Sequence, residues 1–168
     1  MGEQQNSFTR VAGLAPTNAK GTAGFAGCWA VNKSGAALTA GMVLVLDPTA
    51  ANHGAGKVLP VKTTTTAHDP KVCGAVPAGA STIPDGAKFF LQHTGLHTAL
   101  KVDGTTDLAN GDPVDTFTTA GVAAKGSDSS AAGVRARLGV YCDDAYATDA
   151  TTAAKKVWLT NPLGLPSE

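Results

Sequence analysis

Four histidines are the first side chains to consider for chemistry, because two of them have a spacing that metal sites use. His93 and His97 form an HxxxH pattern, which on a helix places both imidazoles on one face. Gly95 interrupts this pattern within a β-type segment, and no glutamate stands beside either histidine, as the HExxH arrangement requires. The other two, His53 and His68, lie in loops rich in Asn and Thr. We therefore expect solvated or edge histidines and no metal.

The carboxylates and hydroxyls are equally poor candidates for catalysis. Asp143 and Asp144 are adjacent after a strand, where neighbouring side chains point to opposite faces and cannot converge on one substrate atom. Four further aspartates between 103 and 115 are typical of turns, although a calcium site remains an alternative without the usual DxDxDG register. The sequence has neither a GxSxG motif nor a phosphate-binding GxxxxGK[ST] loop. We expect no enzyme and no cofactor.

The three cysteines also argue against a metal or disulfide framework. Cys28, Cys73 and Cys142 are widely spaced in apolar segments and form no CxxC pair. We interpret them as reduced, buried residues that act as small hydrophobic side chains.

Composition limits both the fold and the partners. The 168 residues carry 13 basic and 13 acidic side chains, so the net charge gives no electrostatic reason to expect nucleic acid or an anionic membrane as partner. No apolar run approaches the roughly 18 to 20 residues that span a bilayer, and the polar start lacks the features of a signal peptide. Synthesis in a cytoplasm is therefore expected. The only glutamates are Glu3 and Glu168, which makes long solvated helices improbable.

Twenty glycines and nine prolines separate short β-type segments along most of the chain. This pattern predicts an all-β fold, a compact β-barrel or sandwich of about nine short strands, preceded by an extended N-terminal arm. The short Ala-rich stretches Ser129–Ala132 and Asp149–Ala154 are the plausible helical segments. The expected strands are Cys28–Asn32, Met42–Leu46, Lys57–Val61, Val72–Val76, Lys88–His93, Thr98–Val102, Val114–Phe117, Val134–Cys142 and Lys156–Thr160.

Several strands alternate in polarity, which predicts one core face and one face toward solvent or a partner. In Thr98–Val102, Leu100 and Val102 share the expected core face. In the segment 134–140, Leu138 and Val140 share the core face opposite two arginines.

A weak internal echo links two turns. Leu38–Val43 resembles Leu108–Val114, since each has a leucine, a short turn with glycine and the start of a strand. The echo could mark a duplicated β-unit, but we interpret it as common turn chemistry.

The chain divides into an arm at 1–27, a β-barrel domain at 28–162 and a tail at 163–168. The arm is rich in Gly and small residues and orders only when it lies on something, so it is either a terminus without a role or an arm that docks on a neighbouring subunit. The apolar residues of these two segments are the predicted partner-binding residues. They are Phe8, Val11, Leu14, Phe25, Leu163 and Leu165.

The order of turns and strands in residues 70–162 resembles the small β-rich capsid decoration, or cement, proteins of tailed bacteriophages. The resemblance lies in a "leucine–x–x–Gly–Asp–x–Val" turn that enters a strand, then a "Gly–Val" strand and an Ala/Thr loop before the last strand. The segments that carry it are 78–86, Leu100–Val102, Asp107–Val114, Leu138–Cys142 and Lys156–Thr160.

This resemblance implies a structural virion protein with no catalytic residues. Such proteins bind the outer surface of an expanded capsid, frequently as homotrimers, and hold neighbouring major capsid subunits together. The implied partners are the major capsid protein and further copies of the chain, and the implied location is the outer capsid surface. A tail- or fibre-associated β-module and a secreted carbohydrate- or cell-surface-binding module remain alternatives.

Overall fold

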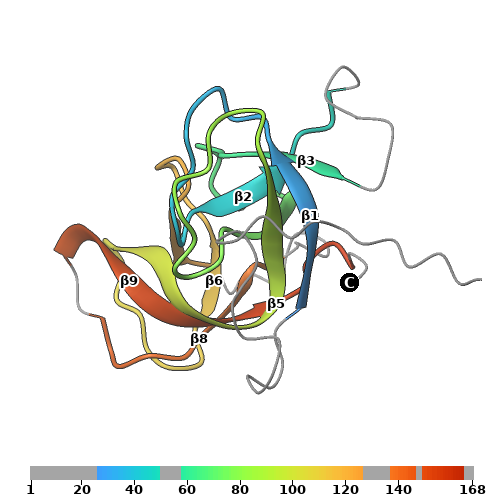
Figure 1. Ribbon diagram of the computed structural model, residues 1–168. Coiled ribbons are helices and arrows are strands. Elements are labelled where there is room, and N and C mark those ends of the chain that lie inside the picture. Colours follow the sequence, from blue (N-terminus) through green and yellow to red (C-terminus); the bar gives the residue numbers. More distant parts are fainter. Residues whose placement is uncertain (1–25, 50–57, 127–136, 147–148, 165–168) are drawn as a thin grey trace, which may run out of the picture.

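The computed structural model describes residues 26–49, 58–126, 137–146 and 149–164, which are drawn in colour in Figure 1. These residues form an all-β structure of nine strands without a helix, which confirms the predicted fold class. No helix that is long and apolar enough to cross a membrane is found in this part of the chain. The strands are β1 (Ala26–Asn32), β2 (Val43–Leu46), β3 (Leu59–Lys62), β4 (Val72–Ala75), β5 (Lys88–Gly104), β6 (Pro113–Thr116), β7 (Ala123–Lys125), β8 (Gly139–Tyr141) and β9 (Asp149–Thr160).

The strand pairings close twice on the long strand β5. The order β1-β3-β2-β4-β5 returns to its start because β5 also pairs with β1, which makes a closed N-terminal barrel. The order β5-β7-β6-β8-β9 closes in the same way through pairing of β9 with β5, which makes a closed C-terminal barrel. Figure 1 shows β1, β2 and β3 in the upper part of the molecule, β8 and β9 in the lower part, and β5 running between them.

The two barrels have the same strand topology. In each of them the first and third strands are parallel, β1 with β3 and β5 with β7, and every other pairing is antiparallel. An isolated bridge precedes the second strand in both, from Leu38 to Ile83 and from Leu108 to Tyr146. The chain therefore contains one five-strand arrangement twice, with β5 shared between the copies.

The turns that echo each other in sequence are equivalent in this repeat. The Gly41 N–H donates to the carbonyl of Val76 at 3.0 Å, and the Gly111 N–H donates to the carbonyl of Tyr141 at 2.9 Å. Both glycines have a positive φ, of 77° and 96°, which glycine adopts without steric cost. Our interpretation of the echo as turn chemistry alone was wrong, because the turns begin equivalent strands.

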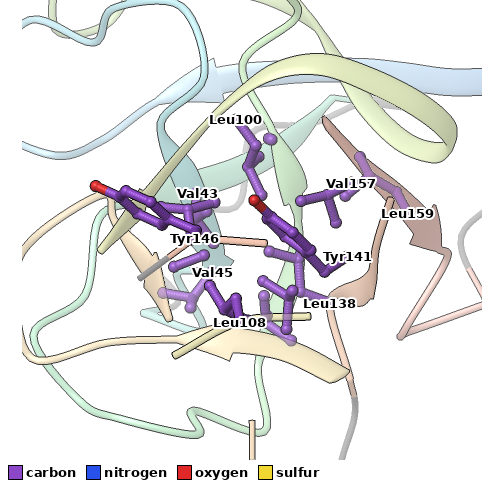
Figure 2. Close-up of a cluster of buried hydrophobic side chains, with 14 residues drawn as sticks. Val43, Val45, Leu100, Leu108, Leu138, Tyr141, Tyr146, Val157 and Leu159 are labelled. Carbon is purple, nitrogen blue, oxygen red and sulfur yellow. The ribbon is translucent and has the colours of Figure 1, made fainter. Parts of the chain in front are cut away.

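Each barrel has its own apolar core. The N-terminal core consists of ten buried residues, namely Cys28, Ala30, Leu38, Leu44, Val61, Cys73, Val76, Ile83, Phe89 and Leu91. The C-terminal core, shown in Figure 2, is larger and includes Tyr141 and Tyr146. It also takes in Val43 and Val45 of β2, whose side chains point away from the N-terminal core. The outward-facing side chains of β2 in the N-terminal barrel thus form part of the core of the C-terminal barrel.

The observed secondary structure differs from the prediction in three places, each because of pairing between strands. The segments Lys88–His93 and Thr98–Val102 are parts of one strand, because β5 keeps its pairing with β9 through Gly95 and continues past an irregularity between His97 and Leu100. Residues 149–154, predicted as helical, extend β9 along β5. The three-residue strand β7 was not predicted.

The cysteine prediction is confirmed for two residues. Cys28 and Cys73 are free and buried in the N-terminal core, whereas Cys142 is free but half-buried. The Cys73 thiol donates to the carbonyl of Leu44 at 3.3 Å. Burial is the main cause that raises the pKa of the Cys73 thiol, so the neutral thiol is favoured in the fold.

Candidate interaction surface

Three apolar side chains form a row on the outer face of β8, β9 and β5. Trp158 of β9 is paired directly with Val140 of β8 on one side and with Leu96 of β5 on the other. Trp158 is 45% exposed and Val140 is 36% exposed, while Leu96 is half-buried. We call these three residues the apolar row. It is the clearest candidate for a binding surface among the described residues.

Strand alternation explains why a tryptophan points outward here. Val157 and Leu159 flank Trp158 in β9, and both are fully buried in the C-terminal core. Successive side chains of a strand point to opposite faces, so Trp158 must project away from this core. A run of three apolar residues in a two-faced strand therefore signals an outward apolar side chain, and the sequence prediction missed this signal.

The outward position of Val140 corrects a prediction. We expected Leu138 and Val140 on one core face, but the core holds Leu138 and Tyr141, and Val140 points out. Gly139 lies between Leu138 and Val140, and a Cβ atom on it would overlap the carbonyl oxygen of Trp158. This close approach of β8 to β9 requires glycine and brings Val140 beside the indole.

Hydrogen bonds hold the two core tyrosines that lie beneath the apolar row. The Tyr141 hydroxyl donates to the carbonyl of Asp144 at 2.8 Å, and the Tyr146 hydroxyl donates to the carbonyl of Thr151 at 2.6 Å. Burial, followed by the charges of Asp143 and Asp144, raises the pKa of Tyr141 to about 12. Buried and bonded tyrosines of this kind keep the sheet rigid, and a rigid surface loses little entropy when it docks.

Charged side chains flank the row on β9. The Asp143 carboxylate accepts the Lys156 N–H at 3.1 Å, and the Lys156 ammonium lies 3.7 Å from the same carboxylate. This backbone hydrogen bond is the main cause that lowers the pKa of Asp143. The Lys155 ammonium lies over the ring of Tyr146, 4.1 Å from its centroid.

Two of the histidines are not the solvated or edge residues that we predicted. His93 and His97 both lie in β5 and are fully buried. The Ala99 N–H donates to Nδ1 of His97 at 3.2 Å, so the ring proton sits on Nε2, which donates to the carbonyl of Val76 at 2.9 Å. Burial lowers the pKa of His97, and the neutral ring links the two barrels. His53 lies outside the described residues.

A second polar cluster joins the barrels at the loop between β3 and β4. The Thr116 hydroxyl of β6 accepts the Asp69 N–H at 2.7 Å and donates to the carbonyl of Thr66 at 3.0 Å. The His68 N–H donates to the carbonyl of Thr116 at 3.1 Å, and Nδ1 of His68 lies 3.2 Å from the Asp115 carboxylate. We call these five residues the inter-barrel clip. Within the described ranges no three His, Cys, Asp or Glu residues are grouped as a metal site would need.

Most of the predicted partner-binding residues cannot be placed. Phe8, Val11, Leu14 and Phe25 lie outside the described residues, as does Leu165. Leu163 is half-buried and packs against the N-terminal core, so replacing it would lower the stability of the fold as well as any binding. Leu163, the predicted residue that is described, is not part of the apolar row.

Comparisons with known proteins add little to this geometry. No protein-family model matches the chain, and no curated protein matches its sequence. Among solved structures, the fold is similar to the N base of head fiber gp8.5 in bacteriophage phi29, with 12% identity and a TM-score of 0.45. The similarity covers 82% of this chain and 95% of that chain.

Proposed function

We propose that the chain is a structural virion protein that binds the outer surface of an expanded phage capsid and stabilises contacts between major capsid subunits. In this role it acts as a homo-oligomer, a trimer by the resemblance described above. It works by protein–protein contact and not by catalysis.

The apolar row is the observation that carries this proposal. A tryptophan that is 45% exposed and flanked by Val140 and Leu96 is typical of a protein contact, since Trp is enriched at the centres of interfaces. The row lies on a sheet shared by two packed barrels, so binding needs no reordering of the surface.

The residues that carry the family resemblance support the proposal through their place in the fold. Residues 100–102 lie in β5, Val114 lies in β6, and residues 139–141 form β8. Residues 156–160 belong to β9. Apart from 78–86, which precedes β5, the quoted segments thus contain strands of the C-terminal barrel, which is also the barrel that carries Val140 and Trp158.

The N-terminal segment is the proposed contact with the capsid. Its residues Phe8, Val11, Leu14 and Phe25 are isolated apolar side chains in a stretch of small residues. The described residues form two apolar cores among themselves, so we expect deletion of residues 2–24 to leave a folded domain that no longer adds to capsids. Undiminished capsid binding by this deletion would show that the segment is not the anchor.

Co-sedimentation with purified capsids tests the proposed function directly. The wild-type chain is mixed with expanded empty capsids and, as the control, with unexpanded shells of the same phage. We expect saturable binding to the expanded shells and a higher temperature of capsid disruption. A chain that stays in the supernatant at every concentration is not a decoration protein. Binding to isolated tails or fibres would favour the tail-associated alternative, and binding on a glycan array would favour a carbohydrate-binding module.

A further inference from the structure

One barrel of this fold already covers the outer face of another within the chain. Val43, Val45 and Ala75 of the N-terminal barrel point outward from Leu44 and its core, and they belong to the core of the C-terminal barrel. Gln92, the cross-strand partner of Ala75, is also buried. The C-terminal barrel therefore seals the outer face of β2, β4 and β5.

The repeat identifies the equivalent face of the C-terminal barrel. Gly74 in β4 and the first residue of β8, Gly139, occupy equivalent positions, because a Cβ atom on either one would overlap a carbonyl oxygen of the adjacent strand. That oxygen belongs to Gln92 in one barrel and to Trp158 in the other. Gln92 and Trp158 are thus the same position in the two copies of the fold.

The equivalent residues differ in size, polarity and exposure. The pair Ala75 and Gln92 is 0% and 4% exposed, whereas the pair Val140 and Trp158 is 36% and 45% exposed. The C-terminal barrel has the larger and more apolar side chain at both positions. Val140 and Trp158 are thus apolar and exposed where the equivalent residues of the other barrel are buried. We expect this pattern when a surface is buried in an assembly.

We propose that the apolar row binds a β-barrel of a second copy of this chain. The argument for this occupant is the intramolecular interface, because a barrel of the same fold is what covers the equivalent face in the N-terminal barrel. Trp158 is the central contact, since buried tryptophans carry a large share of binding energy at interfaces. This inference deepens the proposed function by assigning its self-association to the face of β8, β9 and β5.

Light scattering of full-length variants tests the inference. Trp158→Lys places a charge in the centre of the row, and Thr152→Lys places the same charge at an exposed position far along β9 as the matched control. We expect an oligomeric wild type, self-association weakened by at least about 10-fold in Trp158→Lys, and no change in Thr152→Lys. Val140→Lys gives a second variant if the first fails to fold, as checked by circular dichroism and the unfolding temperature.

The outcomes separate this inference from capsid binding. An oligomer that depends on Trp158 but ignores capsids supports the inference and removes the proposed function. A variant with a charged row that keeps the wild-type mass overturns the inference, whatever the capsid assay gives. A monomeric wild type whose capsid binding is lost in Trp158→Lys also overturns it, because the row would then bind capsid protein instead of a second copy.

Discussion

The two barrels share one topology but differ in what covers them. The outer face of β2, β4 and β5 is buried beneath the C-terminal barrel, whereas β8 and β9, which correspond to β4 and β5, expose Val140 and Trp158. Their cores differ too, because the N-terminal core holds two cysteines and the C-terminal core holds two hydrogen-bonded tyrosines. The same strand arrangement therefore has a buried outer face in the N-terminal barrel and an exposed apolar face in the C-terminal barrel.

Removing one large side chain from each core in turn is the strongest test of whether the two barrels unfold together. We expect Phe89→Ala in the N-terminal core and Tyr141→Ala in the C-terminal core each to cost about 3–5 kcal/mol of unfolding free energy. Because both barrels share β5, either variant should unfold in one transition with the whole domain. Urea unfolding with peptide-resolved hydrogen exchange measures this. If only the mutated barrel opens early, the barrels are independent units.

Adding one carbon at the equivalent glycines tests the repeat itself. Gly74→Ala and Gly139→Ala both force a Cβ atom against a carbonyl oxygen of the next strand. Overpacking of this kind costs about 1–3 kcal/mol, so both unfolding temperatures should fall, and that of Gly74→Ala should fall further because the φ of Gly74 is 156°. A large loss in one variant and none in the other would show that the two sites are not equivalent.

Loosening the inter-barrel clip should lower the stability by an amount of the same order. Thr116→Val keeps the shape of the side chain but removes the hydroxyl that bonds to Asp69 and Thr66. The buried Asp69 N–H would lose its partner, at a cost of about 1–3 kcal/mol. Thermal unfolding measures the loss, with Thr118→Val at an exposed position two residues along as the control. Equal stability of the two variants would show that the clip contributes nothing.

The two barrels should contribute to the pH dependence of the unfolding free energy at opposite ends of the pH range. In the C-terminal barrel, the hydrogen bond from Lys125 is the main cause that lowers the pKa of Asp112, so its stabilisation is present at neutral pH and is lost in acid, below about pH 4. In the N-terminal barrel the pKa of Cys73 is raised, so stability is lost as pH rises above about 8.5. Unfolding temperatures against pH should flatten in acid for Asp112→Asn and in base for Cys73→Ala. Unchanged slopes would refute these assignments.

The fold class could be predicted from sequence because turn residues and polarity alternation mark most strands locally. Leu100 and Val102 were placed correctly in a core for this reason. The continuity of β5 past Gly95 and the extension of β9 over 149–154 could not be predicted, because pairing between distant strands overrides local propensity there. The repeat was visible only as one echo, since it is carried by backbone hydrogen bonds and few side chains are alike.

The candidate surface could be predicted only in part. Trp158 stands between two apolar residues of one strand, and this signal alone marks an outward side chain. The position of Val140 could not be predicted, because Leu138 lies just before β8 and is buried without following the alternation of Gly139, Val140 and Tyr141. Neighbours from β5 and β8 complete the row, and strand pairing between residues 62 and 18 positions apart is not readable from local sequence.

Covalent labelling of the two tryptophans tests most directly whether the row is covered on assembly. Trp158 lies in the row, whereas Trp29 packs edge-on against Phe90 on β1 and β5 and serves as the internal control. Labelling followed by mass spectrometry is carried out over a series of protein concentrations. We predict that labelling of Trp158 falls several-fold as copies associate while that of Trp29 stays constant. Equal labelling of Trp158 at all concentrations, in a chain shown to be oligomeric, would contradict this account.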